Sequence, residues 1–209
     1  MNRLGKVILA GLLLIGSADV KAQGERKPYF QLNTGFSIPV SETLSEFWGS
    51  GLGLGIGAGY VLNQKFTILA SLNYNRFKIN EDKFLTLEGL DTSVASIEKG
   101  GITTFSAFAE AKMGGVRRED LRMVPYVIAG LGFFRFKSDD VIQVIPIIGP
   151  PELKRTAVTE SDFGVSAGGG VNIRLTDRFD LYLEGGLVIG FLPGSSTQLF
   201  PVKLGLALQ

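Results

Sequence analysis

The chain has 209 residues, enough for one domain or one barrel, and contains neither cysteine nor histidine. Their absence excludes disulfides, thiolate metal sites, cysteine nucleophiles and histidine-based catalytic triads. With 21 Lys and Arg against 20 Asp and Glu, the net charge of +1 lacks the basic excess of a nucleic-acid-binding protein, so no nucleic acid is expected as a partner. Glycine, at 28 residues, is about twice as frequent as the usual ~7 %.

Residues 1–22 have the layout of a secretory signal peptide. Arg3 and Lys6 precede the apolar run 7–15, and the small-x-small pattern 20–22 fits a cleavage site before Gln23. The apolar run is too short to span a bilayer, which takes about 20 residues. We therefore predict a cleaved signal peptide over 1–22 and a single domain over 23–209.

Eight segments of the remaining chain alternate apolar with small or polar residues, the period-2 pattern of β-strands. In the second segment, five glycines at every other position from Gly51 to Gly59 make up one face, which predicts a crowded interior where side chains from across the lumen need room. The predicted strands are 30–38, 51–62, 66–74, 103–113, 125–133, 163–173, 181–191 and 200–208.

The connections between these segments alternate in length. Residues 63–65 and 176–178 are predicted to be tight turns and 114–122 an intermediate, charged link, whereas 39–50, 75–102, 134–162 and 192–199 are longer. Short turns at one end, long loops at the other and an even number of strands of about 9–11 residues are typical of outer-membrane barrels.

The apolar face of all eight segments contains no charged residue, and the opposite face is too rich in glycine for a surface exposed to water. We therefore expect the apolar face to contact lipid and the sheet to close on itself, because every backbone amide in lipid must be paired. Aromatic residues on the apolar face gather at the strand ends, as expected for girdles at the two membrane interfaces. The predicted girdle consists of Phe30, Phe36, Tyr60, Phe66, Tyr74, Phe105, Phe133, Phe163, Phe191 and Phe200.

Residues 125–132 (PYVIAGLG) and 168–171 (GGGV) resemble strands of the small eight-stranded outer-membrane β-barrel family, the OmpX-like and OmpA-type barrels. The C-terminal run 203–209 is similar to the family's assembly signal through Leu208, without its terminal aromatic residue. The resemblance implies an all-β, eight-stranded antiparallel up-and-down transmembrane barrel in the Gram-negative outer membrane. Its implied partners are membrane lipid, lipopolysaccharide and the outer-membrane assembly machinery.

Charged residues on the glycine-rich face should lie in the barrel lumen, where charges are tolerated only when paired. Arg174 should lie about opposite Asp180 across the turn at 176–178. We interpret these charges as a structural salt-bridge network, because an eight-stranded barrel has room inside only for side chains; the alternative is a proton path or a gated pore. The predicted network is Glu110, Lys112, Arg174, Asp180, Glu184 and Lys203.

Two loops are candidates for binding. Loop 79–100 is rich in acidic residues but lacks a recognisable metal-ligand spacing, so no metal and no cofactor is expected. Loop 134–162 carries an apolar stretch that could be a partner-binding hairpin or a strand extension packing on a neighbouring loop. Its candidate residues are Val141, Ile142, Val144, Ile145, Ile147 and Ile148.

These observations predict a non-enzymatic barrel with a structural or surface-interaction role, whose specificity lies in extracellular loops 79–100 and 138–160 and whose ligand is unknown. The alternatives are a small-solute, porin-like channel and a soluble, lipocalin-like binding barrel. Enzyme families built on similar barrels depend on histidine, which this chain lacks. A hydrolase that uses only Asp and Glu in these loops is a further alternative.

Overall fold

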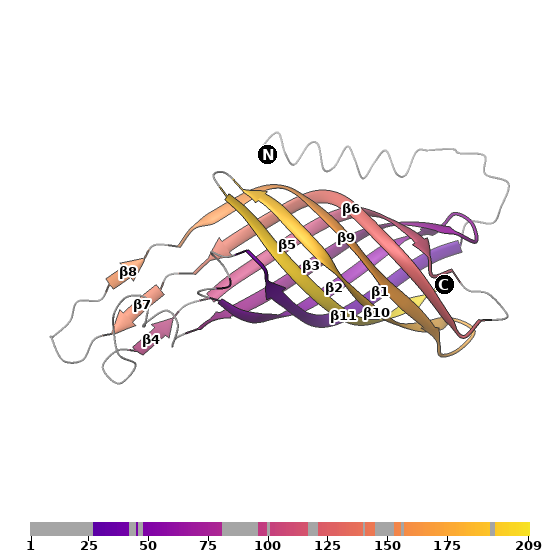
Figure 1. Cartoon of the computed structure of the whole chain (residues 1–209), viewed down its shortest axis with the longest axis horizontal. Helices are drawn as coiled ribbons and strands as arrows, with labels where there is room; N and C mark the ends of the chain where they lie inside the picture. The colour runs from indigo at the N-terminus through magenta and orange to yellow at the C-terminus, as the bar shows by residue number, and fades with distance from the viewer. Residues whose placement is uncertain are drawn as a thin grey trace.

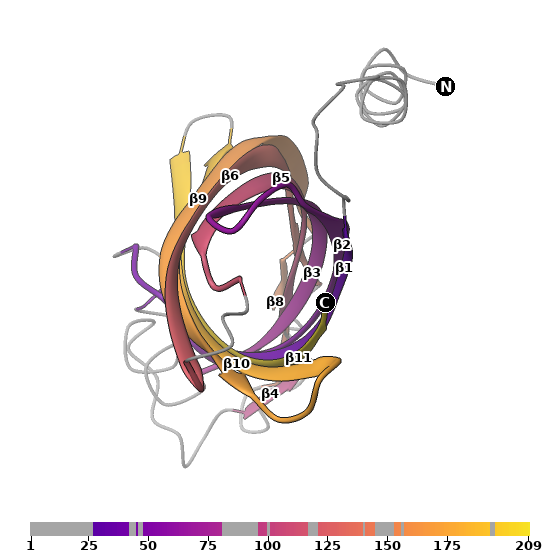
Figure 2. The ribbon, with the colours of Figure 1, turned by 90° about the vertical axis from the view of Figure 1, so that its right-hand side faces the viewer.

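The computed structural model describes residues 27–41, 45, 48–80, 96–99, 101–116, 121–139, 141–144, 153–155, 157–192 and 195–209. Eight long antiparallel strands form a closed barrel in the order β1-β11-β10-β9-β6-β5-β3-β2 (Figures 1 and 2). Each barrel strand pairs with its chain neighbour in the barrel, and β1 pairs with β11 to close the sheet, so the up-and-down prediction is confirmed. The barrel strands are β1 (Lys27–Pro39), β2 (Trp48–Val61), β3 (Phe66–Ile79), β5 (Gly101–Gly114), β6 (Met123–Ser138), β9 (Thr159–Arg174), β10 (Phe179–Leu192) and β11 (Ser195–Leu208).

The connections that follow β2, β5 and β9 lie at one end of the barrel, which we call the turn end. After β2, the Asn63 side-chain oxygen accepts hydrogen bonds from the backbone N–H groups of Lys65 (2.8 Å) and Phe66 (3.0 Å), an Asx-type turn. After β9, the Thr176 hydroxyl accepts in the same way from Arg178 and Phe179. Both predicted tight turns are therefore confirmed, and a turn-forming side chain accounts for each.

The opposite end, which we call the loop end, differs from the prediction at one connection. Residues 192–199 are not a long loop, because Leu192 pairs with Ser195 and only two residues separate β10 from β11. Residues 195–199 of the predicted loop instead continue the ladder as the start of β11.

Most barrel strands also continue farther toward the loop end than the apolar alternation predicts. β3 runs to Ile79 instead of residue 74, and β6 to Ser138 instead of residue 133. Backbone pairing persists beyond the point where the outward residues cease to be apolar, so the sequence pattern marks only the apolar part of each strand.

Three short strands, β4 (Ser96–Lys99), β7 (Val141–Val144) and β8 (Leu153–Arg155), form a second sheet in the order β4-β7-β8. Figure 1 shows them beyond one end of the barrel. β4 belongs to the connection between β3 and β5, whereas β7 and β8 belong to the connection between β6 and β9. The two long connections are therefore joined by strand pairing.

The apolar faces of the strands point outward, as predicted. Leu52 is 77 % exposed and Leu54 63 % exposed, while the neighbouring inward positions are occupied by glycine. The outward surface is therefore lined by apolar side chains over most of the length of the strands, where a barrel dissolved in water would carry polar ones.

The glycines of β2 make room for neighbouring strands, which corrects the expectation that they accommodate side chains from across the lumen. A Cβ added at Gly55 would lie 2.6 Å from the side-chain oxygen of Asn73 on β3 and 2.7 Å from that of Asn33 on β1. At Gly57 it would meet Gln31 of β1 at 2.8 Å. Side chains from β1 and β3 thus lean across β2 inside the barrel.

Candidate functional site

The lumen is filled in three layers. Near the turn end, Tyr29, Tyr126 and Tyr182 pack with Val61 and Leu69 in one buried cluster. Near the loop end, Phe77, Ile102, Phe134, Leu192 and Leu199 form a second cluster. Polar residues occupy the space between and beside these two clusters. A cavity lined by these polar residues and by the loop-end cluster has a volume of only ≈ 30 Å³, room for about one or two waters.

Lys112 lies at the centre of the turn-end layer. Its ammonium nitrogen is 3.6 Å from the centre of the Tyr126 ring, 5.2 Å from that of Tyr29 and 5.6 Å from that of Tyr182. It donates hydrogen bonds to the Tyr29 hydroxyl (3.0 Å) and to the Asn172 side-chain oxygen (3.4 Å). The side chain is 1 % exposed, so a buried cation is stabilised here by three aromatic rings and two neutral acceptors.

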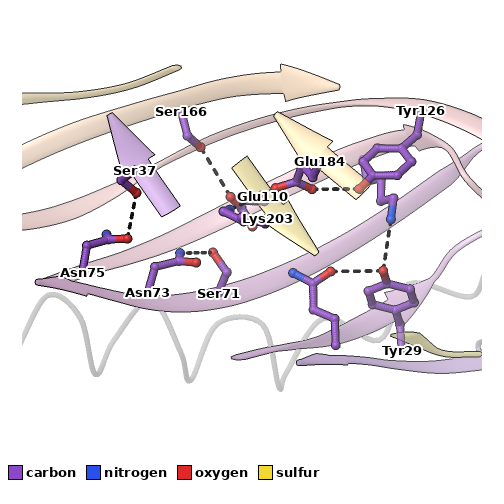
Figure 3. A network of polar contacts seen from close by, with 12 residues as sticks. Tyr29, Ser37, Ser71, Asn73, Asn75, Glu110, Tyr126, Ser166, Glu184 and Lys203 are labelled. Atoms are coloured by element: carbon purple, nitrogen blue, oxygen red, sulfur yellow. Dashed lines mark hydrogen bonds and ion pairs between the residues drawn. The ribbon is translucent and has the colours of Figure 1, made fainter. Parts of the chain in front are cut away.

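Glu184 and Lys203 form a buried ion pair in the middle layer. The Lys203 ammonium group donates to one Glu184 carboxylate oxygen at 2.9 Å, and the Tyr126 hydroxyl donates to the other at 3.0 Å. Both side chains come from inward positions of the neighbouring strands β10 and β11, which place them directly opposite each other. Figure 3 shows the hydrogen bond from Tyr126 to Glu184. The ring of Tyr126 faces Lys112, so this tyrosine connects the ion pair to the Lys112 ammonium group.

Glu110 lies in the same layer, two residues before Lys112 on β5. Its carboxylate accepts a hydrogen bond from the Ser166 hydroxyl at 3.4 Å, and its side chain is buried. Toward the loop end, the polar contacts continue in a row that links three strands: the Ser37 hydroxyl donates to the Asn75 side-chain oxygen, whose amide nitrogen donates to Thr104.

Arg174 and Asp180 stand opposite each other in the pairing of β9 with β10, as predicted from the turn between them. The Asp180 carboxylate accepts a hydrogen bond from the Gln209 side chain at 2.8 Å. Gln209 and Asn172 both donate to the backbone oxygen of Gly115, at 3.3 Å and 2.7 Å. The six predicted lumen residues thus occupy inward positions, and Glu184 with Lys203 is the described ion pair among them. Neutral side chains connect other members: Tyr126 links Glu184 to Lys112, and Gln209 and Asn172 meet at Gly115 between Asp180 and Lys112.

The three tyrosines around Lys112 were not among the residues predicted for the lumen network. A signal was present, because Tyr126 and Tyr182 lie on the face opposite the apolar one, where an aromatic residue is unexpected unless it fills the interior. Periodicity gives the face of each residue but not which strands face one another across the barrel.

The predicted girdle residues occupy outward positions near the two ends of the strands. Nine of the ten are exposed, and Phe133 is half-buried. At the loop end, Tyr74 stands opposite Phe105 and Phe133 opposite Phe163 in the strand pairing. The rings of Phe163 and Phe191 stack with their centres 6.2 Å apart. The placement is that of an aromatic band around an aliphatic belt.

The apolar candidate stretch of the second long loop lies partly within β7, which contains Val141, Ile142 and Val144. Its backbone pairs with β4 of the other long connection, which is the strand-extension alternative. Ile145, Ile147 and Ile148, residues 1–22 and most of the acidic loop lie outside the described residues.

The described residues contain no group of three or more Asp and Glu that could hold a metal ion. Among those same residues, no helix has the length and apolar character needed to cross a membrane.

Comparison with known proteins places this architecture in a class. The model of the outer membrane protein beta-barrel domain family matches residues 8–191. The chain therefore belongs to this family of outer-membrane β-barrels, and the outer membrane is its location. No curated protein matches the sequence.

Solved structures share the fold at low sequence identity. Neisserial surface protein A matches with a TM-score of 0.57 and 17 % identity, covering 88 % of this chain and 99 % of its own. OprG from Pseudomonas aeruginosa matches with a TM-score of 0.51 and 10 % identity, covering 90 % and 98 %. A major outer membrane protein from Thermus thermophilus matches with a TM-score of 0.51 and 12 % sequence identity, and the match covers 88 % of this chain and 99 % of that protein.

Proposed function

We propose that this barrel is a non-enzymatic surface-interaction protein, whose partner is recognised by the two long connections 79–100 and 138–160. The observation that carries the proposal is the pairing of β4 with β7, which joins these connections into one sheet beyond the barrel. Two separate loops would each be free to move, whereas a shared sheet holds them in a defined relative position. Rigid presentation of loop residues lowers the entropy lost on binding.

The barrel itself is suited to act as a support. Its lumen is occupied by the side chains described above, and the described residues offer no histidine or cysteine for catalysis. Binding and catalytic residues occur preferentially on loops that a rigid scaffold positions. In this proposal the loop end faces outside the cell and the turn end faces the periplasm.

Limited proteolysis of intact cells tests the orientation. External protease should cleave the chain within 80–100 or 139–158 and leave the carbonate-washed membrane fragment closed, as judged by a different gel mobility before and after boiling. Cleavage only after the outer membrane is permeabilised would place the long connections in the periplasm and overturn the proposal.

Loop replacement tests the recognition. Residues 80–100 and 139–158 are each replaced by one short linker, and cells are bound to an array of immobilised polysaccharides and extracellular proteins. The matched control carries the same linker in the β10–β11 hairpin, which lies at the same end of the barrel. We expect both replacements to abolish the same array signals, because each removes one side of the β4–β7 pairing. Identical signals from native and replaced chains would exclude the loops as the recognition element.

A further inference from the structure

On two barrel strands, the outward residues change from aromatic to basic near the loop end. On β3, Tyr74 is followed at the next outward positions by Arg76 and Lys78. On β6, Phe133 is followed by Arg135 and Lys137. All four basic side chains are exposed on the outside of the barrel, immediately beyond the aromatic band at the loop end. We call Arg76, Lys78, Arg135 and Lys137 the basic patch.

The register brings the two strands' basic residues together. Arg76 pairs with Thr103 of β5, which pairs in turn with Lys137, so one half-buried threonine separates the two cations in a single row across the sheet. Arg135 stands two residues from Lys137 along β6. With neighbouring strands about 4.8 Å apart and about 3.4 Å per residue along a strand, the Cα atoms of Arg76 and Lys137 lie roughly 10 Å apart, and the longest separation in the patch, between Lys78 and Arg135, is roughly 17 Å.

The patch occupies one side of the barrel. Next to β6, the corresponding outward positions of β9 carry Ser161 and Thr159, paired with Arg135 and Lys137. On the other side of the barrel, β1 continues outward with Ile38 and Val40, and β11 with Gln198 and Ser196. Basic and hydroxyl groups therefore face outward over β3, β5, β6 and β9, whereas the remaining described loop-end positions are apolar or neutral.

Among the described residues, one carboxylate forms an ion pair with the basic patch, so most of the positive charge of the patch remains. Lys137 pairs with Asp139 at 3.6 Å, a contact in which both side chains are about half exposed and therefore easily exchanged. Glu160 and Asp162 of β9 pair with Phe136 and Phe134, which places them at inward positions and not on the outer face.

We propose that the basic patch binds the phosphates of a lipid headgroup in the bilayer leaflet at the loop end, a phosphorylated glycolipid of the outer leaflet. The aromatic band marks the level where hydrocarbon gives way to headgroups, and lipid acyl chains cover the apolar belt directly below it. A lipid whose chains lie against this belt presents its headgroup at the height of the four cations. Arginine is well suited to bind phosphate oxygens in pairs, and the hydroxyls of Thr103 and Ser161 are additional donors beside them. This inference does not depend on what the long connections recognise.

Lipid binding by the refolded full chain tests the proposal. Native mass spectrometry in a zwitterionic detergent counts bound lipid during titration with purified bis-phosphorylated lipid A and with its dephosphorylated form. R76Q/R135Q removes two charges from the patch while keeping side-chain length. The control K65Q/R178Q removes the same charge from two exposed residues in the turns at the opposite end.

We expect the native chain and K65Q/R178Q to prefer the phosphorylated lipid, and R76Q/R135Q to bind it about tenfold or more weakly, as lost charge-assisted contacts imply. Inorganic phosphate at millimolar concentration should not displace the lipid, because the acyl chains contribute to binding. Equal weakening in both variants, equal binding of the two lipids, or displacement by inorganic phosphate would each overturn the proposal. If R76Q/R135Q does not refold to the heat-shifted form, K78Q/K137Q makes the same test.

Discussion

The Lys112 ammonium nitrogen lies 3.6 Å from the centre of the Tyr126 ring, and both side chains are buried in the lumen. Tyr126 also donates a hydrogen bond from its hydroxyl to Glu184, so this tyrosine contacts the Lys112 ammonium group with its ring and the Glu184 carboxylate with its hydroxyl. Together with Tyr29 and Tyr182, this arrangement closes the barrel near the turn end. A filled lumen is the feature that most clearly separates a support for loops from a channel.

We therefore expect the native barrel to show no conductance steps in planar lipid bilayers. Lys112→Ala combined with Tyr126→Ala removes the centre of the plug and should produce small steps, provided that the variant still shows the heat-dependent mobility shift. Tyr60→Ala is the matched control, because Tyr60 points outward and its loss should leave the lumen closed. Steps of equal size from native and variant proteins would support the small-solute channel instead.

The ion pair of Glu184 with Lys203 should have a large effect when only one partner is removed. Glu184→Gln leaves a buried ammonium group without its carboxylate and should lower the free energy of unfolding by about 3–5 kcal/mol. Glu184→Leu with Lys203→Met should recover most of this loss, because no uncompensated charge remains. Urea unfolding from lipid vesicles measures both.

The exposed pair of Lys137 with Asp139 supplies the control for this measurement. Asp139→Asn should cost less than about 1 kcal/mol, since both partners remain accessible to water. A similar loss from Glu184→Gln and Asp139→Asn would mean that the lumen is wet enough to solvate Lys203.

Positive charge on the apolar belt should destabilise the barrel according to depth. Leu54→Arg and Leu183→Arg should each cost about 2–4 kcal/mol if they lie near the middle of the bilayer. Ile38→Arg, one outward position beyond Phe36 on β1, should cost about 0–1 kcal/mol because it lies near the interface. Equal effects at the three positions would contradict the outward orientation of this face, and unfolding from vesicles makes the comparison.

Glycine is required at Gly55 because the space of its side chain is already occupied. Gly55→Ala would place a Cβ 2.6 Å from the Asn73 side-chain oxygen, and the forced shift should cost about 1–3 kcal/mol. At Gly185, which points outward, the nearest atom to an added Cβ is the Phe200 ring at 3.8 Å. Gly185→Ala should therefore be neutral or stabilise the barrel by up to about 1 kcal/mol, as measured by the same unfolding assay.

The sequence by itself determined the number of barrel strands, the face of each residue and the position of the short turns. These follow from local chemistry: alternation has a period of two in any strand, and Asn63 and Thr176 stabilise their turns through hydrogen bonds to nearby backbone groups. The outward apolar face could also be inferred, because a glycine-rich opposite face is unsuited to water.

Only the tertiary structure decided which inward side chains meet. Lys112 on β5 is enclosed by tyrosines from β1, β6 and β10, and these contacts depend on how the sheet curls and closes, which no local pattern encodes. Tertiary structure also decided where the strands end. They extend beyond the segments with alternating apolar residues, because backbone hydrogen bonds continue wherever neighbouring strands remain paired. That extension places Arg76 and Lys137 in one row on either side of Thr103, and strand pairing joins the two long connections through β4 and β7. Both proposed interaction surfaces therefore arise from pairing between segments that are distant in the chain.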